Sequence, residues 1–266
     1  MVSSAPRIRN DEGTHAGFLD ERGFTITADR NRERLVRNEP LRIGLYLAAL
    51  GFSAATFSAA QVPSDYQGTP YHDSHYTGAA QAVPGRVMCA YYDLGGEGVA
   101  YHDSDSKNNG SGALNPADGT YLNEFRMHEG VDTSYTKYHD QIDNSPFEAV
   151  QPPVNLLYVG WTVPGEWFKI TVDVRHSGHY TADLLYTSNH GGTISMDVNG
   201  KDVTGPLTIP STYNATDPIA WRQWHHWNVA KKLINLYLHS GKNVLSVHIL
   251  TEGNMNLSYF DFRKAN

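Results

Sequence analysis

Residues 167–174 read WFKITVDV, a run in which every second side chain is strongly apolar. Alternation with a period of two is typical of a β-strand that buries one face. The run stops at Ser177 and Gly178. Similar runs follow at residues 179–186, 193–198, 233–238, 243–250 and 256–262. The repeated pattern predicts a fold built from short antiparallel strands.

Turn residues separate these runs. Asn199-Gly200 follows residues 193–198, and this dipeptide favours a tight type I′ hairpin. A helical pattern is conceivable at residues 219–232, but the three tryptophans there argue against it. Short strands at this spacing, rich in Val, Ile, Thr and Tyr, predict an all-β fold. We expect a jelly-roll β-sandwich of two antiparallel sheets over residues 85–266.

The composition excludes some classes of function. The 266 residues include 21 Lys and Arg against 28 Asp and Glu, a formal net charge of −7. No basic block lies downstream of the N-terminal region, so we expect no nucleic-acid partner. Cys89 is the only cysteine, which rules out an intramolecular disulfide and a thiolate zinc site. It lies in the apolar run VMCA, where a cysteine usually acts as a small buried hydrophobe.

The N-terminal region has the three parts of an export signal. Residues 43–57 read IGLYLAALGFSAATF, an uncharged apolar run that follows Arg37 and Arg42. It ends in Ser58-Ala59-Ala60, small residues that suit signal peptidase. We therefore expect residues 1–60 to be an N-terminal extension plus a secretory signal peptide, and the protein to be secreted or periplasmic.

Two further expectations concern this region. The apolar run is shorter than the ~20 residues of a spanning helix, so no permanent membrane anchor is expected, and a buried helix is the alternative. Residues 1–42 are polar and charge-mixed, which suggests that translation starts after Met1, near Val36. Residues 61–84 are rich in Gly, Pro, Ser, Tyr and Gln and predict a linker or extended arm.

Several separated motifs resemble a known family. Residues 92–103 read YDLGGEGVAYHD, residues 159–167 read VGWTVPGEW, and residues 256–262 read NLSYFDF. With Phe125-Arg126 and residues 129–132, they occur in the order found in family 6 carbohydrate-binding modules. The resemblance spans about residues 86–263. It implies a jelly-roll sandwich that binds a poly- or oligosaccharide without catalysis, and glycoside hydrolases that act alongside it.

The resemblance also implies a binding site in which two aromatic rings hold a sugar. The first ring corresponds to Phe125, where the family more often has tyrosine. The second corresponds to Trp221 or Trp224 in the segment AWRQWHHW at residues 220–227. We expect Trp221 to be the platform and Trp224 or Trp227 to pack into the core.

An asparagine and a structural calcium complete the family pattern. Asn256 best matches the asparagine that binds sugar hydroxyls, with Asn254 as the competitor. The calcium is held in the family by two glutamates of the first strand and an acidic residue near the end. Here Met88 and Ala90 replace the glutamates and Asp261 remains. Because calcium needs several oxygen ligands, the loss of two carboxylates should weaken such a site.

Other carboxylates suggest alternatives. Glu166 invites a role as a general acid, but a glycosidase normally needs a second carboxylate at a defined separation, and no residue pairs with it convincingly. Asp103, Asp105 and Asn109 could form another oxygen-rich site, although Lys107 interrupts the spacing and a solvated loop is the simpler interpretation.

Two other functions stay open. A glycoside hydrolase or lyase can be built on the same sandwich, and so can a structural or adhesive protein of the cell envelope. Residues 133–156 and 211–218 are longer than the corresponding connections of the family. We expect these insertions to change the rim of the binding site, so the preferred glycan cannot be copied from the family.

Overall fold

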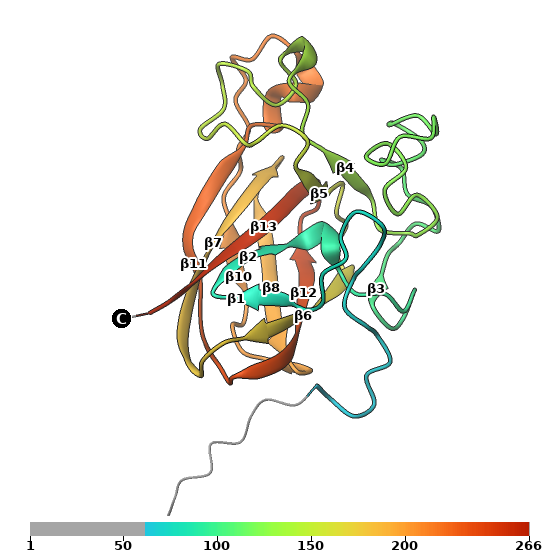
Figure 1. Ribbon diagram of the computed structural model, residues 1–266. Helices are drawn as coiled ribbons and strands as arrows, with labels where there is room; N and C mark the ends of the chain where they lie inside the picture. The colour runs from blue at the N-terminus through green and yellow to red at the C-terminus, as the bar shows by residue number, and fades with distance from the viewer. Residues whose placement is uncertain (1–61, 266) are drawn as a thin grey trace, which may run out of the picture. The chain divides into compact units, whose positions relative to one another are not determined.

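Two β-sheets that face each other form the body of the protein (Figure 1). The computed structural model describes residues 62–265. The strands of the first sheet are β1 (Gln81–Val83), β3 (Tyr101–His102), β6 (Trp167–Val174), β8 (Gly192–Val198), β9 (Lys201–Asp202), β10 (Leu207–Ile209) and β12 (Gly241–Thr251). The strands of the second sheet are β2 (Gly85–Met88), β4 (Thr133–Tyr135), β5 (Leu157–Val159), β7 (Gly178–Ser188), β11 (Asn228–Leu238) and β13 (Met255–Lys264).

The strand order in each sheet skips along the sequence. The first sheet is ordered β1-β6-β12-β8-β10, with β3 paired to β6 and β9 to β8. The second is ordered β11-β7-β13-β5-β4, with β2 paired to β13. Only the β1–β6 pair among the described strands is parallel. The helical turns η1 (Cys89–Tyr91), η2 (His139–Gln141) and η3 (Ala220–Trp224) are short 3-10 helices. The predicted all-β jelly-roll sandwich is confirmed.

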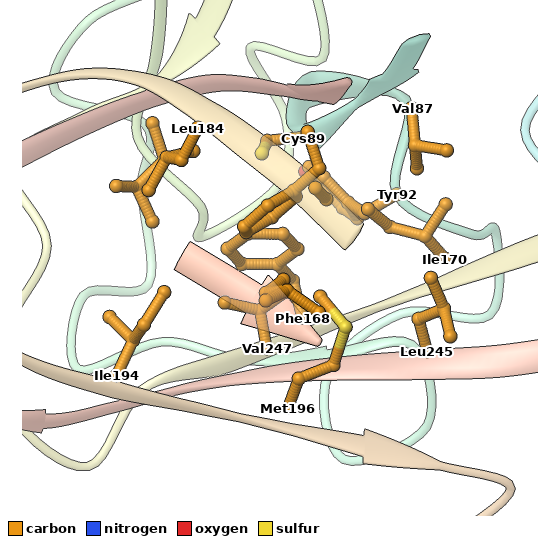
Figure 2. Close-up of a cluster of buried hydrophobic side chains, with 14 of the residues drawn as sticks. Val87, Cys89, Tyr92, Phe168, Ile170, Leu184, Ile194, Met196, Leu245 and Val247 are labelled. Carbon is orange, nitrogen blue, oxygen red and sulfur yellow. The ribbon is translucent and has the colours of Figure 1, made fainter. Parts of the chain in front are cut away.

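The alternating stretch that predicts the fold is β6, a strand near the middle of the first sheet. Phe168, Ile170, Val172 and Val174 are buried and belong to the core between the two sheets. Figure 2 shows Phe168 and Ile170 among side chains of the opposite sheet, such as Leu184. Cys89 lies fully buried in the same core, as predicted, and burial raises the pKa of its thiol.

The predicted hairpin is also present. Asn199 and Gly200 have φ angles of 53° and 79°, the left-handed values that a type I′ turn requires. Val198 of β8 pairs directly with Lys201 of β9 across this turn. The short turn therefore sets the register of the hairpin.

Residues 62–84, the described part of the predicted linker or arm, pack against the sandwich. The β1 strand adds to β6, with Gln81 opposite Val172. Tyr71 is only 6% exposed, and its ring stacks on Tyr91 with the centroids 5.2 Å apart. The arm therefore contributes to a small aromatic core outside the main one.

The predicted export signal at residues 43–57 and its exit at residues 58–60 lie outside the described residues, and so do the start site near Val36 and the N-terminal extension. Among residues 62–265, no helix is long and apolar enough to cross a membrane.

The core predicts the effect of removing an apolar side chain. Leu184 of β7 is fully buried between the sheets, so Leu184→Ala should lower the free energy of unfolding by about 2–5 kcal/mol. The same substitution at Leu250, which is 39% exposed at the end of β12, should change it by less than about 0.5 kcal/mol. Chemical denaturation of both variants measures the difference. Equal losses would contradict this description of the core.

Candidate functional site

Two loops from distant parts of the sequence meet at one end of the sandwich. They are residues 136–156, between β4 and β5, and residues 210–227, between β10 and β11 (Figure 1, upper end). The Arg222 guanidinium donates a hydrogen bond of 2.9 Å to the carbonyl of Gln141. The backbone carbonyl of Trp227 accepts N–H bonds from Ala149 and Val150. Each loop therefore supports the other.

Asp217 fixes the turn η3 in the second loop. Its fully buried carboxylate accepts hydrogen bonds from Arg222, 2.7 Å from Nε to Oδ2 and 3.0 Å from Nη2 to Oδ1. His226 Nε2 lies 3.0 Å from Oδ2, and the N–H of Ile219 donates to Oδ1 at 2.9 Å. The Arg222 bonds hold the pKa of Asp217 well below its usual range. The ionised carboxylate thus anchors the segment that carries two of the tryptophans.

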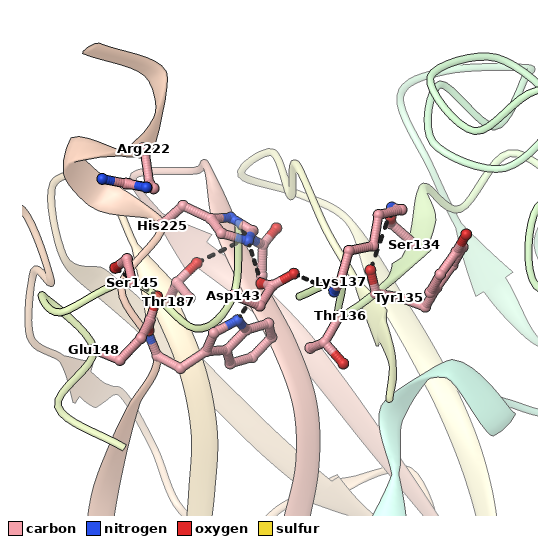
Figure 3. Close-up of polar contacts among 12 residues, drawn as sticks. Ser134, Tyr135, Thr136, Lys137, Asp143, Ser145, Glu148, Thr187, Arg222 and His225 are labelled. Atoms are coloured by element: carbon pink, nitrogen blue, oxygen red, sulfur yellow. Dashed lines mark hydrogen bonds and ion pairs between the residues drawn. The ribbon is translucent and has the colours of Figure 1, made fainter. Parts of the chain in front are cut away.

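A second buried carboxylate, Asp143, links the two loops (Figure 3). Its Oδ1 accepts a 2.6 Å bond from Trp227 Nε1 and lies 2.8 Å from His225 Nε2. Its Oδ2 accepts a 2.6 Å bond from the backbone N–H of Lys137. One side chain therefore orients a histidine, a tryptophan and the backbone of the first loop.

These contacts fix the tautomer of His225. The Asn256 amide nitrogen lies 3.0 Å from His225 Nδ1 and 2.8 Å from the Thr187 hydroxyl oxygen, and it donates to both. Because Nδ1 accepts this bond, Nε2 carries the proton and donates to Asp143. The imidazole is held on both sides and forms a rigid floor.

Above this floor lies a hollow of about 460 Å3, here called the aromatic pocket. Its walls carry the rings of Tyr158, Trp161, Trp221 and Trp224. Its polar lining consists of Asn115, Ser134, Lys137, His139 and His225, and Leu114 and Ile142 complete it. The volume falls in the range of small-molecule sites, about 300–1,000 Å3. Trp221 is 54% exposed and presents an aromatic surface that no neighbour covers fully.

The structure brings together two of the residues that the sequence predicts for the site. Trp221 and Trp224 both line the aromatic pocket, with ring centroids 6.2 Å and 5.6 Å from that of His225. Trp227 is fully buried and packs edge-on against Tyr158, as expected for a core tryptophan. Within this short segment, Trp221 and Trp224 line the pocket and Trp227 packs in the interior.

The other two predicted residues lie elsewhere. Phe125 is 2% exposed and contacts Tyr71, Tyr91 and Tyr121 in the small aromatic core, so it offers no open face to a ligand. Asn256 is 1% exposed and lies beneath the pocket, where it orients His225 as described above. Neither side chain lines the aromatic pocket.

Tyr158 and Lys137 line the pocket but do not stand out in the sequence, and Trp161 is visible there only as part of the motif VGWTVPGEW. Tyr158 and Trp161 lie on either side of Val159-Gly160. A Cβ at Gly160 would approach Asn256 Oδ1 to 2.7 Å. The glycine lets the end of β5 pass over the asparagine, and Trp161 follows with a φ of 48°. Lys137 belongs to the predicted insertion at residues 133–156. The unusual length of this insertion is the feature of the sequence that indicates a contribution to the site.

A second hollow of about 420 Å3 lies over the first sheet, between the arm, β6, β12 and the turn that joins β8 to β9. Its aromatic residue is Tyr66, whose hydroxyl donates to Asp93 at 2.7 Å. The Lys169 ammonium lies 5.1 Å from the centre of that ring. The Tyr66 hydroxyl and its ring therefore both have partners within the protein. This hollow lacks an exposed aromatic ring like that of Trp221 in the aromatic pocket.

The residues expected for a structural calcium do not form a suitable ligand set. Asp261 pairs with Arg263 on the same strand, and Arg86 is its cross-strand neighbour. Ala90 is fully buried and Met88 has no carboxylate to offer. Among residues 62–265, no group of three or more His, Cys, Asp or Glu side chains is placed to hold a metal ion.

Glu166 is buried and its carboxylate binds the polypeptide itself. Oε1 accepts bonds from the N–H and the hydroxyl of Ser104, and Oε2 accepts one from the N–H of Val163. Burial raises the pKa of its neighbours Asp103 and Asp132, to about 7 and about 6, and the charge of Glu166 adds to both shifts. The hydrogen bonds of Glu166 therefore hold the backbone at Ser104 and Val163 in place.

No protein-family model matches the chain, and no curated protein matches it either. The similar solved structures are mostly carbohydrate-binding modules of families 6 and 35. One is a β-1,3-glucan-binding family 6 module from Bacillus halodurans, with 16% identity, a TM-score of 0.40, and coverage of 69% of this chain and 98% of that one.

A family 35 module from Clostridium thermocellum has 22% identity and a TM-score of 0.34, over 44% of this chain and 84% of that one. A family 43 glycoside hydrolase, an arabinoxylan arabinofuranohydrolase from Bacillus subtilis, has 15% identity and a TM-score of 0.40. This chain spans about a third of that enzyme, 33%, and the match covers 74% of this chain. Since these similarities are weak, the chemistry of the site rests on its own side chains.

Beneath the pocket, Glu148 predicts a pH dependence. Its carboxylate accepts a bond from the backbone N–H of Trp227 and lies 3.2 Å from the Ser145 hydroxyl. Burial raises the pKa of Glu148 to about 8. The folded protein therefore keeps a proton that the unfolded chain loses near pH 4.5, so this group weakens folding as the pH rises from about 4.5 through about 8.

Glu148→Gln imitates the protonated form and should remove this loss. The melting temperatures of variant and wild type should agree near pH 4, and the variant should melt a few degrees higher at pH 9. Thermal unfolding followed by circular dichroism measures this. Glu252→Gln, at an exposed position, is the control and should follow the wild type. A constant difference between Glu148→Gln and the wild type at all pH values would contradict the assignment.

Proposed function

We propose that the protein binds a poly- or oligosaccharide in the aromatic pocket and does not transform it. The observation that carries this proposal is the exposed ring of Trp221 beside Trp224, Tyr158 and Trp161 around one hollow. Sugars present flat faces of C–H groups, which pack well on aromatic planes. The exposed ring of Trp221 provides such a plane, and the other three rings make the lining around it aromatic.

The polar lining supports the same proposal. His139 presents an exposed ring with two nitrogens, and Lys137 carries an ammonium group that is held by the buried polar groups of Asn115 and Ser134. An imidazole both donates and accepts and an ammonium donates, so together they suit sugar hydroxyls, which do both. A predominantly aromatic pocket with a few polar groups therefore fits a carbohydrate better than a purely apolar ligand.

The acidic side chains support a binding role over a catalytic one. No aspartate or glutamate lines the aromatic pocket. Hydrolysis of a glycosidic bond normally uses two carboxylates on either side of it. Glu166, the residue that first suggests such chemistry, is engaged with Ser104 and Val163. Release of products from a glycan by the purified protein would favour the enzyme instead.

We infer that the protein is exported, on the pattern of residues 43–60, and that it works alongside glycoside hydrolases. N-terminal sequencing of the native protein tests the first inference. A mature chain that begins near Gln61 would support it, and peptides from residues 1–30 in the native protein would refute the later start site.

The exposed tryptophan predicts the effect of its removal. Trp221→Ala should weaken binding to the recognised glycan at least tenfold, about 1.4 kcal/mol, because the ring loses its packing on the sugar. Affinity electrophoresis of the protein against xylan, β-glucans, agarose and mannan identifies the glycan. Calorimetry on the variant then measures the loss.

The matched control is Tyr237→Ala, at an aromatic residue 40% exposed on β11 and absent from the pocket lining. It should bind as the wild type does, and both variants should keep the wild-type melting temperature. Undiminished binding by Trp221→Ala would show that the aromatic pocket is not the site.

A further inference from the structure

Lys137 brings a positive charge into the aromatic pocket. Its ammonium donates a short hydrogen bond of 2.8 Å to the Asn115 amide oxygen. Two longer bonds of 3.3 Å go to the Ser134 hydroxyl and the Tyr135 carbonyl. The ammonium also lies 4.1 Å from the centre of the Tyr135 ring. All of these partners are neutral, so the ammonium is hydrogen-bonded but its charge is not neutralised.

No acidic side chain forms an ion pair with Lys137 in the part of the chain that the structure describes. The acidic residue whose charge acts on it is Asp143, and that carboxylate already binds His225, Trp227 and the backbone N–H of Lys137 itself. Burial lowers the pKa of the Lys137 ammonium, and the charge of Asp143 offsets only part of this shift.

The unpaired charge has a cost that a bound anion would offset. Lys137 is half-buried, and a charge that is partly removed from water loses part of its hydration. The other titratable side chains of the pocket lining are His139, His225 and Tyr158, and none of them is acidic. The chain as a whole has a formal net charge of −7, so a positive pocket is a local feature of this site.

We propose that the aromatic pocket selects an acidic sugar, whose carboxylate or sulfate group lies against the Lys137 ammonium while its ring packs on the tryptophans. This inference rests on the proposed function and names its ligand class. Lys137 acts in it as a specificity-determining residue. The anionic group of the sugar is a stronger acceptor than the Ser134 hydroxyl and the Tyr135 carbonyl. It would therefore replace the two 3.3 Å hydrogen bonds of the Lys137 ammonium.

Matched pairs of glycans test the proposal on the full chain. Oligosaccharides that contain uronic acid are compared by calorimetry with their carboxyl-reduced forms, and sulfated galactan oligosaccharides with their desulfated forms. We expect one acidic member to bind at least tenfold more tightly than its neutral partner. Its affinity should fall as sodium chloride rises from 50 to 500 mM, on the order of several-fold, because salt screens charge attraction. The pair that shows the difference identifies the anionic group.

Lys137→Met should remove this preference, so that the acidic and the neutral partner bind with similar affinity. Lys242→Met, at an exposed lysine of β12 outside the pocket lining, is the matched control and should keep the preference. Should Lys137→Met fold poorly, the salt dependence of the wild type decides alone.

The outcomes separate the two proposals. Binding that depends on Trp221 but is equal for acidic and neutral partners, and insensitive to salt, would overturn the acidic-sugar proposal and leave carbohydrate binding intact. Loss of the preference in Lys242→Met as well would also overturn the role of Lys137. Absence of binding to every acidic and neutral glycan would refute the proposed function itself.

Discussion

The carboxylate of Asp143 is the interaction on which the candidate site depends. It is completely buried, and its two oxygens bind a histidine, a tryptophan and a backbone N–H from two loops far apart in the sequence. A buried carboxylate is tolerated only when its lone pairs are satisfied, so these three donors are needed for the loops to stay together. Without it, Trp227 and His225 would each keep an unpaired buried polar atom.

This arrangement builds a pocket from two loops whose regular structure is limited to the short turns η2 and η3. Loops usually move, and a ligand that orders them pays the entropy of doing so. Here the buried carboxylates of Asp143 and Asp217 hydrogen-bond to side chains of the loops. The strands β5 and β13 are joined by the bond from the Ser258 hydroxyl to the Leu157 carbonyl. The rings of the aromatic pocket are therefore largely pre-positioned, and Trp221 stays exposed on a turn whose base is fixed.

Much of the fold could be predicted from local pattern. Residues 167–174 form β6 with the predicted face inward, and Asn199-Gly200 forms the predicted turn, because alternation and turn chemistry act over a few residues. Trp221 and Trp224 line the aromatic pocket, and the aromatic-rich segment that carries them is visible in the sequence. Phe125 was misplaced as a ligand platform because its burial depends on Tyr71 and other rings far along the chain.

The remaining parts of the pocket have no local signal. Lys137 lies in an irregular insertion, and its place beside the tryptophans follows from the Asp143 contacts between loops. Trp161 has a left-handed backbone conformation, with a φ of 48°, which a bulky residue rarely adopts and which the sequence therefore does not predict. Asn256 is a polar residue in a predicted strand, and whether it meets a ligand or a neighbouring histidine is decided by what packs above it.

The place of β13 has a consequence for how the protein is made. This strand lies between β7 and β5 and also pairs with β2, with Phe260 opposite Val87. During synthesis on the ribosome, β2, β5 and β7 emerge well before residues 255–264 and must wait with unpaired edges. The second sheet closes only when its central strand arrives, so folding depends on contacts between early and late parts of the chain. A chain that stalls before Met255 would expose strand edges suited to pairing with other chains.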